Sequence, residues 1–549
     1  MPRIALFFKI VFVLCFWLPV NGQTEIKEHD YTLNYLDKKL EVVFDRPVSV
    51  SAWDAFTGAP ISMQLDSREA HGYVLENITP SEIIKLQYVY LDGKVSTSNT
   101  TYIANASLSS GTINVYFNHP VNTAFAQTQN AVNLGNTLDD MLISYINACT
   151  TTLDIAIYNS DSPSATTGIA GAINAAYTRG VQVRVIYDGS TSSAMIPLLN
   201  SAIPTLASPT SSSYGIMHNK FVIFDANSSD ANRPVVWTGS TNWTVAQIDG
   251  PDKNSAIVIQ DQALALGYKI EFEEMWGSNT MTPNTTLSKF GPYKTDNTPH
   301  SYVIGGKVVN SYFSPSDGAN SKIIAAINSA DSDISVATML ITRTDISSAL
   351  INKFTSGITA TNIVMDSQNP SGNQFSTLQS AINTSQVVKY TGSGILHHKF
   401  MVVDNYNSAS DPQVVVGSHN WSTSAETKND ENMLVVHDAN IANQYYQAFA
   451  YLFQLAGGTL STDVSMLSGK DFILYPNPTT GMVYITAPEN HYTDEVGIEV
   501  YNVLGVPVFE KKFMTITNAT IDLSEAASGV YFVCLHIGGE VYRLKAVRD

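Results

Sequence analysis

The chain contains 549 residues, and its 30 Lys and Arg against 48 Asp and Glu give a formal charge of −18. This acidic balance disfavours a dedicated polyanion-binding protein, because binding to phosphates needs a surplus of cations, but it allows a local basic pocket. Three cysteines exclude a disulfide-dense scaffold. At roughly 100–200 residues per domain, the length predicts about three to five domains.

Residues 1–22 predict a secretory signal peptide. Arg3 and Lys9 provide positive charge, Ile10 to Val20 form a short apolar core, and cleavage is expected near the small residue Gly22. The apolar stretch is shorter than the ~20 residues that a membrane anchor needs. We therefore expect export of the protein.

Residues 24–108 predict a β-rich accessory domain of the immunoglobulin or fibronectin type. Strand-like runs such as YTLNYL and IIKLQYVYL alternate with turn residues, including an Asp-Gly pair. This segment contains no motif that indicates chemistry.

The middle of the chain contains the same plan twice, in residues 109–281 and 307–460, separated by a Pro/Thr/Asn-rich linker at 282–306. Each copy opens with a strand that ends in Tyr-Phe and continues into an amphipathic helix. A buried strand follows, LDIAIY in the first copy and DISVATM in the second. Strands that alternate with helices predict an α/β fold in which a mixed or parallel sheet is flanked by helices.

The residues that indicate chemistry lie late in each copy. Both copies read H-x-K-x4-D, followed by G-S-x-N-W. The first copy supplies His218, Lys220, Asp225, Ser240 and Asn242. The second copy supplies His397, Lys399, Asp404, Ser418 and Asn420.

The spacing within this motif favours phosphoryl chemistry. Side chains two positions apart on a strand face the same way, so the His and Lys of each motif project together. The ammonium group neutralises a phosphate oxygen while the imidazole acts as nucleophile or acid. The Ser and Asn side chains add hydrogen-bond donors for the phosphate. Two copies around a pseudo-twofold axis allow one His to attack phosphorus and the other to protonate the leaving group.

The doubled motif resembles the phospholipase D superfamily. The resemblance implies two repeats that form one pseudo-twofold catalytic unit, and a two-step mechanism through a phosphohistidine without metal or cofactor. It implies that His218 is the nucleophile and His397 the general acid, and that the motif Lys and Asn residues bind the phosphate. Asp225 and Asp404 face away from these groups on an ideal strand, so a catalytic role and a structural role are both open for them.

An acidic residue about a dozen positions after the G-S pair orients a catalytic His in this family. Glu431 matches this position in the second copy. The glycines of the two G-S pairs differ by 417 − 239 = 178, and this offset places Lys253 opposite Glu431. We expect the adjacent Asp252 to replace the missing acid, and which acid orients which His stays open.

Residues 470–549 predict a small β-sandwich, which follows a Gly/Ser/Thr-rich joint. The runs LYPNPTTG, YNVLG and SGVYFV and the basic end YRLKAVR are similar to the C-terminal sorting domain of the type IX secretion system. The resemblance implies that the type IX machinery is a partner. It also implies a route through the periplasm to the medium or the cell surface, usually with later cleavage of the domain.

Three functions are compatible with these patterns: a secreted phospholipase D, a secreted nuclease or other phosphodiesterase, and a surface protein without activity. Intact motifs in both copies argue against the third. Residues 109–460 contain 15 Lys and Arg against 25 Asp and Glu, fewer cations than a nuclease cleft is expected to need. We therefore favour a monomeric phospholipase D that releases phosphatidic acid from phospholipids, with nucleic acid as the less favoured substrate.

Overall fold

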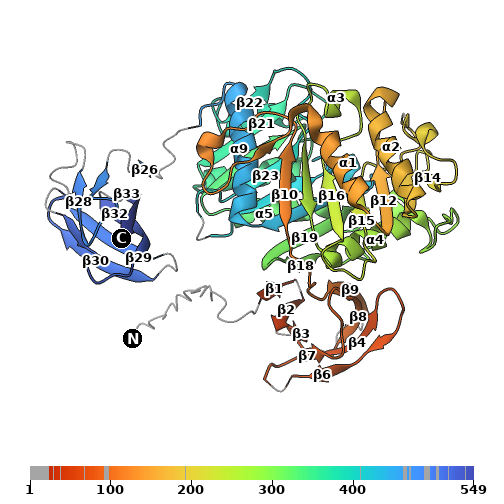
Figure 1. Cartoon of the computed structure of the whole chain (residues 1–549), viewed down its shortest axis with the longest axis horizontal. Coiled ribbons are helices and arrows are strands. Elements are labelled where there is room, and N and C mark those ends of the chain that lie inside the picture. Colours follow the sequence, from red (N-terminus) through yellow and green to blue (C-terminus); the bar gives the residue numbers. More distant parts are fainter. Residues whose placement is uncertain are drawn as a thin grey trace, which may run out of the picture. The chain divides into compact units, whose positions relative to one another are not determined.

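The computed structural model describes residues 24–548, except positions 29, 37–38, 67, 92–97, 192, 408–409, 461–466, 469–471, 487–494, 503–505, 517–518 and 538–539. The predicted signal peptide lies outside the described residues. The chain divides into two compact units, one ending at Gly458 and one beginning at Thr459 (Figure 1). Within the described ranges, none of the helices combines the length and apolar character needed to cross a bilayer.

The first unit begins with a two-layered β-sandwich. One sheet has the order β1-β2-β3-β7-β6 and the other β5-β4-β8-β9. The strands are β1 (Thr24–Lys27), β2 (Tyr31–Leu36), β3 (Lys39–Phe44), β4 (Val48–Asp54), β5 (Pro60–Ile61), β6 (Met63–Leu65), β7 (Gly72–Leu75), β8 (Ile83–Tyr90) and β9 (Asn99–Ala104). Val303 and Val308 pack against the core of this sandwich, which is therefore joined to the second repeat.

The first repeat is a mixed eight-stranded sheet of order β11-β10-β17-β16-β15-β12-β13-β14. Its strands are β10 (Ile113–Phe117), β11 (Val132–Asn133), β12 (Thr152–Ile157), β13 (Gln182–Tyr187), β14 (Thr205–Ala207), β15 (Lys220–Phe224), β16 (Val235–Gly239) and β17 (Ser255–Ile259). Its helices are α1 (Leu138–Ala148), α2 (Pro163–Thr178), α3 (Val245–Ile248) and α4 (Gln262–Trp276), with short 3-10 turns at Thr123–Phe125 (η1), Gly135–Thr137 (η2) and Ile196–Leu198 (η3).

The second repeat has a sheet of the same design, β18-β19-β25-β24-β23-β20-β21-β22. Its strands are β18 (Ser301–Ile304), β19 (Lys307–Ser314), β20 (Asp333–Thr338), β21 (Ala360–Asp366), β22 (Val387–Tyr390), β23 (Lys399–Val403), β24 (Gln413–Gly417) and β25 (Glu431–His437). Its helices are α5 (Ala319–Ser329), α6 (Thr344–Thr355), α7 (Phe375–Ala381), α8 (Thr423–Thr427) and α9 (Ala439–Leu455); the linker before it contains the 3-10 turn η4 (Gly291–Tyr293).

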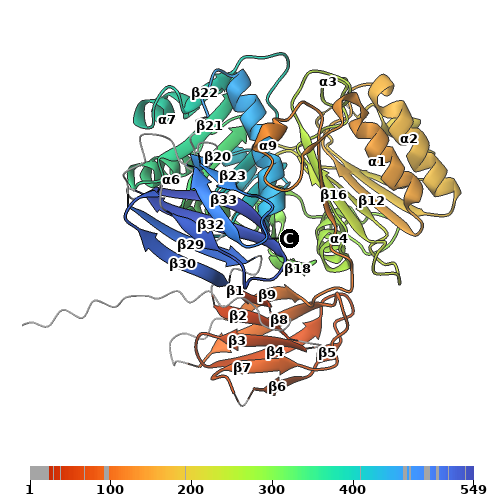
Figure 2. The same ribbon diagram turned by 60° about the vertical axis from the view of Figure 1, so that its left-hand side comes forward.

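Local sequence explains where the two long inner helices, α4 and α9, begin. Asp261 caps α4 by accepting a hydrogen bond from the Leu264 N–H (2.8 Å), and Asp438 caps α9 by accepting one from the Ile441 N–H (2.9 Å). Gly277 ends α4 in the left-handed conformation (φ 76°), where an added Cβ would lie 2.1 Å from the Asn284 carbonyl. Figure 2 shows α1 and α2 on the outer side of the first sheet, and α9 between the two repeats.

The two inner helices join the repeats through one tyrosine each. The Tyr268 ring of α4 packs 5.2 Å from Phe221 of its own repeat and 4.9 Å from Phe313 of the second repeat. In the same way, Tyr445 of α9 packs 5.0 Å from Phe400 of its own repeat and 5.3 Å from Phe117 of the first repeat. The contacts of Tyr268 and Tyr445 are thus equivalent in the two repeats, which confirms the predicted pseudo-twofold α/β unit.

The second unit consists of two further sheets, of order β26-β33-β32-β29-β30 and β27-β28-β31. Its strands are β26 (Leu467–Ser468), β27 (Ile473–Tyr475), β28 (Met482–Thr486), β29 (Val496–Asn502), β30 (Pro507–Phe513), β31 (Thr520–Asp522), β32 (Gly529–Ile537) and β33 (Glu540–Arg548). The predicted all-β regions at both ends of the chain are therefore confirmed.

Candidate active site

The two H-x-K motifs lie at the beginning of equivalent strands, β15 and β23. His218 comes two residues before the first residue of β15, and His397 two residues before the first residue of β23. All four motif side chains are buried. The Lys220 Nζ donates to the His218 carbonyl (2.7 Å), and the Lys399 Nζ donates to the His397 carbonyl (2.6 Å). Each ammonium group is thus held beside the main chain of its own histidine.

Each motif is also hydrogen-bonded to the opposite repeat. The His218 N–H donates to the Asp430 carbonyl (2.9 Å), and the His397 N–H donates to the Lys253 carbonyl (3.0 Å). Met217 pairs with Asp430 and Leu396 with Lys253 in short parallel bridges. The histidines therefore lie at the boundary between the repeats.

The imidazole rings are oriented by side chains of the opposite repeat. His218 Nδ1 lies 2.7 Å from Glu431 Oε2, and His397 Nδ1 lies 2.9 Å from Asn254 Oδ1. Because both partner atoms are acceptors, each Nδ1 carries the proton and each Nε2 presents a lone pair. One histidine is thus oriented by a carboxylate and the other by a neutral amide.

The serines of the two G-S pairs hold these orienting groups. Ser418 Oγ donates to Glu431 Oε2 (2.8 Å), and Ser240 Oγ donates to Asn254 Oδ1 (3.2 Å). The same two hydroxyls accept hydrogen bonds from the N–H groups of Asn432 (3.0 Å) and Ser255 (3.2 Å). These contacts favour a positioning role for Ser240 and Ser418 over the predicted direct binding of the phosphate, because each hydroxyl donates its proton to the residue that holds an imidazole.

The contacts of Asp252 differ from those expected of an acid that orients a histidine. Its Oδ1 accepts a hydrogen bond from the Ile395 N–H (2.8 Å), while Lys253 Nζ lies 3.3 Å from the Ser393 carbonyl. The equivalent of Glu431 is Asn254, at an offset of 431 − 254 = 177 rather than 178, because the connection after the G-S pair is one residue shorter in the second copy. The similar strands SAIVI and NMLVV are the signal in the sequence that could have identified Asn254. Aligning these strands, rather than applying the offset of the G-S pairs, places Asn254 opposite Glu431.

Asn242 and Asn420, the other predicted phosphate-binding residues, follow these serines in the two copies. The amide oxygen of each is buried and has no hydrogen-bond partner among the described residues. The main-chain N–H of Asn242 donates to Gln247 Oε1 (2.7 Å), which fixes the backbone at this position.

Asp225 and Asp404 lie at the far ends of β15 and β23, away from the histidines. The Asp225 carboxylate accepts hydrogen bonds from the N–H groups of Thr150 (3.0 Å), Thr151 (2.6 Å) and Thr152 (3.2 Å). Asp404 binds the N–H groups of Asp331 and Ser332 in the equivalent loop (2.8 and 2.7 Å). Both aspartates have positive φ, 53° and 57°. Of the two roles left open by the sequence, these contacts favour the structural one, in which each aspartate ties the loop before a buried strand to the motif strand.

We expect Asp225→Asn to lower the stability of the protein rather than its activity. The amide keeps one acceptor oxygen but leaves buried N–H groups of the Thr150–Thr152 loop without a partner, which costs about 1–3 kcal/mol. Urea denaturation of the variant measures this loss, and Asp404→Asn provides the matched change in the other repeat. A stable variant with a large loss of kcat would contradict the structural role.

Burial and the two lysines together determine the protonation of the site. Burial lowers the pKa of His218 to about 4; Glu431 opposes this shift, and Lys220 adds to it. Burial also lowers the pKa of His397 well below its usual value, with Lys399 and Lys220 adding to the effect. Burial lowers the pKa of Lys399 to about 7 and that of Lys220 in the same direction. Both histidines are thus neutral at neutral pH, and a bound anion would offset the closely spaced cations.

The sequence did not single out Tyr158, which follows β12. Its ring packs edge-on to the His218 ring, with centroids 4.7 Å apart, and Lys220 Nζ lies 5.1 Å from its centre. The half-buried phenol ring therefore forms one wall beside His218.

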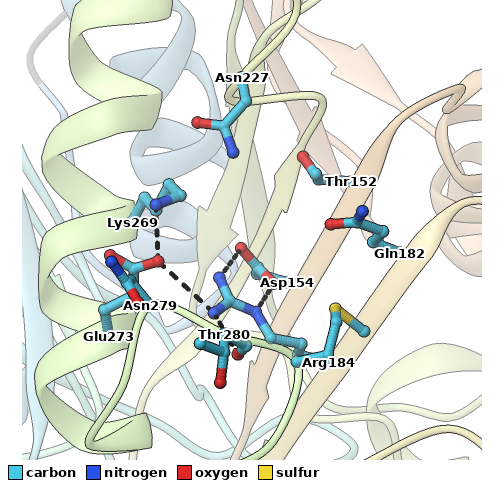
Figure 3. A pocket seen from close by; sticks show the side chains of 10 residues that line it. Thr152, Asp154, Gln182, Arg184, Asn227, Lys269, Glu273, Asn279 and Thr280 are labelled. Carbon is cyan, nitrogen blue, oxygen red and sulfur yellow. Dashed lines mark hydrogen bonds and ion pairs between the residues drawn. The ribbon is translucent and has the colours of Figure 1, made fainter.

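A polar pocket of about 240 Å³ lies at the Asp225 end of the first sheet rather than beside the histidines (Figure 3). Its charges are satisfied internally: the Arg184 guanidinium donates to both oxygens of Asp154 (2.7 and 2.8 Å), and Lys269 donates to Glu273 (2.6 Å). This arrangement stabilises the contact between the sheet and α4, and it presents no unpaired charge to a phosphate.

Among the described residues, Asp296, His300 and Asp317 lie close enough together to hold a metal ion. His300 Nε2 is 3.1 Å from Asp296 and 3.6 Å from Asp317. Burial opposes protonation, but the two carboxylates outweigh it and raise the pKa of His300 to about 10. The group is therefore complete as an ion pair between an imidazolium and two carboxylates.

Comparisons with known proteins identify the families of the two repeats and of the C-terminal domain. Residues 142–276 and 323–453 match the family model "Cardiolipin synthase, PLD-like domain", and residues 473–547 match "Secretion system C-terminal sorting domain". The chain therefore carries two phospholipase D-like domains and a C-terminal sorting domain. The sorting domain implies secretion or a location at the cell surface.

Two similar curated proteins are a mitochondrial cardiolipin hydrolase of Xenopus tropicalis and a phospholipase D of Rickettsia prowazekii. The first is 33% identical over 127 residues, which are 23% of this chain and 54% of the relative. The second is 29% identical over 140 residues, 25% of this chain and 64% of the relative. The chain thus spans about half to two thirds of these relatives. The crystal structure of Nuc, a phospholipase D family member from Salmonella typhimurium, is 28% identical, with a TM-score of 0.24, and the match covers 27% of this chain and 94% of that one.

Proposed function

We propose that the protein is a secreted phospholipase D that hydrolyses phospholipid headgroup esters to phosphatidic acid. The observation that carries this proposal is the pair of buried His-Lys motifs, each with its imidazole oriented by the opposite repeat. Two neutral imidazoles with free Nε2 atoms and two ammonium groups meet the requirements for in-line displacement at a phosphodiester.

In the proposed first step, His218 Nε2 forms a bond to phosphorus while the bond to the headgroup oxygen breaks. His397 donates a proton to that oxygen, and Lys220, Lys399, Asn242 and Asn420 bind the phosphate. In the second step, His397 takes a proton from water, the water oxygen attacks phosphorus, and the bond to His218 breaks. Binding of the phosphate anion beside the two lysines raises the pKa of His397, which lets it carry the proton for the first step.

The lipid substrate is favoured over nucleic acid by charge and by similarity. Residues 109–460 carry 15 Lys and Arg against 25 Asp and Glu, whereas polynucleotide binding gains affinity from basic residues. The curated relatives include proteins named as cardiolipin hydrolases and phospholipases D. The proposed partners are a phospholipid surface and, through the C-terminal domain, the type IX secretion machinery.

The test is an assay of the purified mature protein on phosphatidylcholine vesicles and on plasmid DNA, each with EDTA present. Release of phosphatidic acid by the wild type but not by His218→Ala supports the proposal. Cleavage of DNA without lipid hydrolysis would reassign the substrate, and a requirement for a divalent ion would contradict the metal-independent mechanism.

The pH dependence should follow Lys399. Its pKa is lowered to about 7, so the ammonium loses its proton and its charge as the pH rises through neutrality. We expect kcat/KM for a phosphodiester to fall above about pH 7 for this reason, because the free site then holds one cation fewer. In Lys399→Arg the guanidinium stays charged, so the part of the alkaline fall that Lys399 causes should disappear, even if the overall rate is lower and Lys220 still titrates at higher pH. An unchanged alkaline limb in the variant would assign the titration to another group.

A further inference from the structure

The linker between the repeats enters the protein interior beside His218. Gly291 in η4 donates its N–H to Asp430 Oδ1 (2.7 Å), directly before β25. Gly291 has a φ of 51°, and an added Cβ would lie 2.6 Å from the Lys428 carbonyl. This close approach requires a residue without a side chain and fixes the linker against the residues that precede Glu431.

Three residues further on, the linker places a cation in the same region. Lys294 Nζ forms a short ion pair with Glu271 of α4, lies 3.9 Å from Asp430 Oδ1, and donates to the Ser314 carbonyl (3.2 Å). The side chains of Lys294, Glu271 and Asp430 are 0%, 1% and 3% exposed. One ammonium group thus joins the first repeat, the linker and two strands of the second repeat.

These contacts lead directly to the proposed nucleophile. The Asp430 carbonyl accepts the His218 N–H, and the Asp430 N–H donates to the Ile216 carbonyl (3.0 Å). The next residue, Glu431, orients the His218 imidazole. Ser314, whose carbonyl Lys294 binds, is the residue paired with Glu431 between β19 and β25.

Among the residues that the structure describes, the other histidine has no buried cation equivalent to Lys294 beside it. The residue equivalent to Asp430 is Lys253, at the same offset of 430 − 253 = 177. Its half-buried ammonium group contacts the carbonyls of Pro251 and Ser393 and forms no ion pair among the described residues. The buried ion cluster is therefore particular to the side of the site that contains His218.

We infer that Lys294 is a positioning residue, which fixes Asp430 and thereby the His218–Glu431 pair, and that the linker is part of the active-site scaffold. The inference rests on the proposed function. Lys294 also supplies a cation for three crowded carboxylates: Glu271 on α4, Asp317 before α5, and Asp430 directly before β25. Without it, these carboxylates would be ionised less readily at a given pH.

The test compares Lys294→Met with Lys289→Met. Lys289 lies in the same linker and pairs with Glu274 of the same helix (2.9 Å), but its side chain is 43% exposed, and its ammonium group contacts Glu274 and Thr295 rather than Asp430. With bis(p-nitrophenyl) phosphate as substrate, Lys294→Met should lower kcat by about 10-fold to 100-fold, the range found for groups that orient functional side chains. KM should change little, and Lys289→Met should resemble the wild type.

The pH profile separates positioning from a general loss of stability. Lys294 lowers the pKa of Asp430 and of Glu271, so without its charge the ionised Asp430 that binds the Gly291 N–H forms only at higher pH. The acid limb of kcat/KM should therefore move to higher pH in Lys294→Met and stay in place in Lys289→Met.

Hydrogen exchange provides a readout that does not need activity. Lys294→Met should speed exchange of the amides at 216–218 and 430–432, and Lys289→Met should not.

If no diester is cleaved by the wild type, the proposed function fails while exchange still tests the positioning role. A folded Lys294→Met variant with unchanged kcat, pH profile and exchange overturns the inference. If it does not fold, the charge-balanced Glu271→Gln/Lys294→Met variant takes its place, and unfolding of both would assign Lys294 to global stability and overturn the inference as well.

Discussion

Substitution of either motif histidine by alanine should lower turnover of a phospholipid by at least about 10²–10⁴-fold, the loss typical of a general acid or base. His218 and His397 have different proposed tasks, and each has its own orienting partner, so neither can replace the other. Steady-state hydrolysis of phosphatidylcholine measures the loss. His536→Ala, in the second compact unit, is the matched control for removal of an imidazole.

The leaving group distinguishes the two roles. A p-nitrophenolate leaves without a proton, so His397→Ala should still release a burst of p-nitrophenol from bis(p-nitrophenyl) phosphate and then accumulate a phosphoenzyme. His218→Ala should show neither the burst nor the phosphoenzyme, because the bond to phosphorus cannot form. Mass spectrometry of the trapped protein should locate the phosphoryl group on His218. A phosphoryl group on His397 would reverse the assigned roles, and near wild-type turnover of both variants would contradict the mechanism.

The two orienting residues should respond differently to substitution. Glu431→Gln removes the charge beside His218 and permits the wrong tautomer, and we expect a loss of about 10²–10⁴-fold in kcat, as in catalytic triads. Asn254→Asp introduces a carboxylate beside His397 and should raise the pKa of that imidazole. The His397 pKa can be followed by NMR titration of the C2 proton.

Substitution of the other orienting residue, Asn254, supplies the control for Glu431→Gln. Asn254→Gln keeps a neutral amide beside His397 and alters only its reach, so the loss of kcat should be smaller than that of Glu431→Gln. Equal losses would mean that geometry alone, and not the charge of Glu431, supports the nucleophile.

The sequence identifies the fold and the two motifs because these depend on local patterns. Strand and helix periodicity predicts the α/β repeats, and the H-x-K spacing brings each His and Lys together at the beginning of one strand. Identifying the residue that orients His397 requires an alignment of the two copies. The connection after the G-S pair differs in length by one residue, so a constant offset does not match Asn254 with Glu431. The motif alone does not separate the two possible roles of Ser240 and Ser418, because a hydroxyl that binds a phosphate and one that holds an orienting residue occupy the same position in it.

Tertiary contacts account for what was not predicted. Nothing near Lys294 in the sequence indicates that its ammonium group is buried between α4 and β25, since Glu271 and Asp430 come from different repeats. Asp225 is the opposite case, a residue that the motif singles out for chemistry although its contacts are structural. The motif suggests chemistry, but the carboxylate at the far end of the strand binds the loop N–H groups.

Tyr268 and Tyr445, which contact both repeats, affect how the protein unfolds. Each ring packs against one phenylalanine of its own repeat and one of the other, and each histidine is oriented by the opposite repeat. Separation of the halves would expose both aromatic contacts and release both imidazoles in a single event. The repeats should accordingly melt as one cooperative transition, and partial proteolysis should yield either the intact pair or fragments without activity.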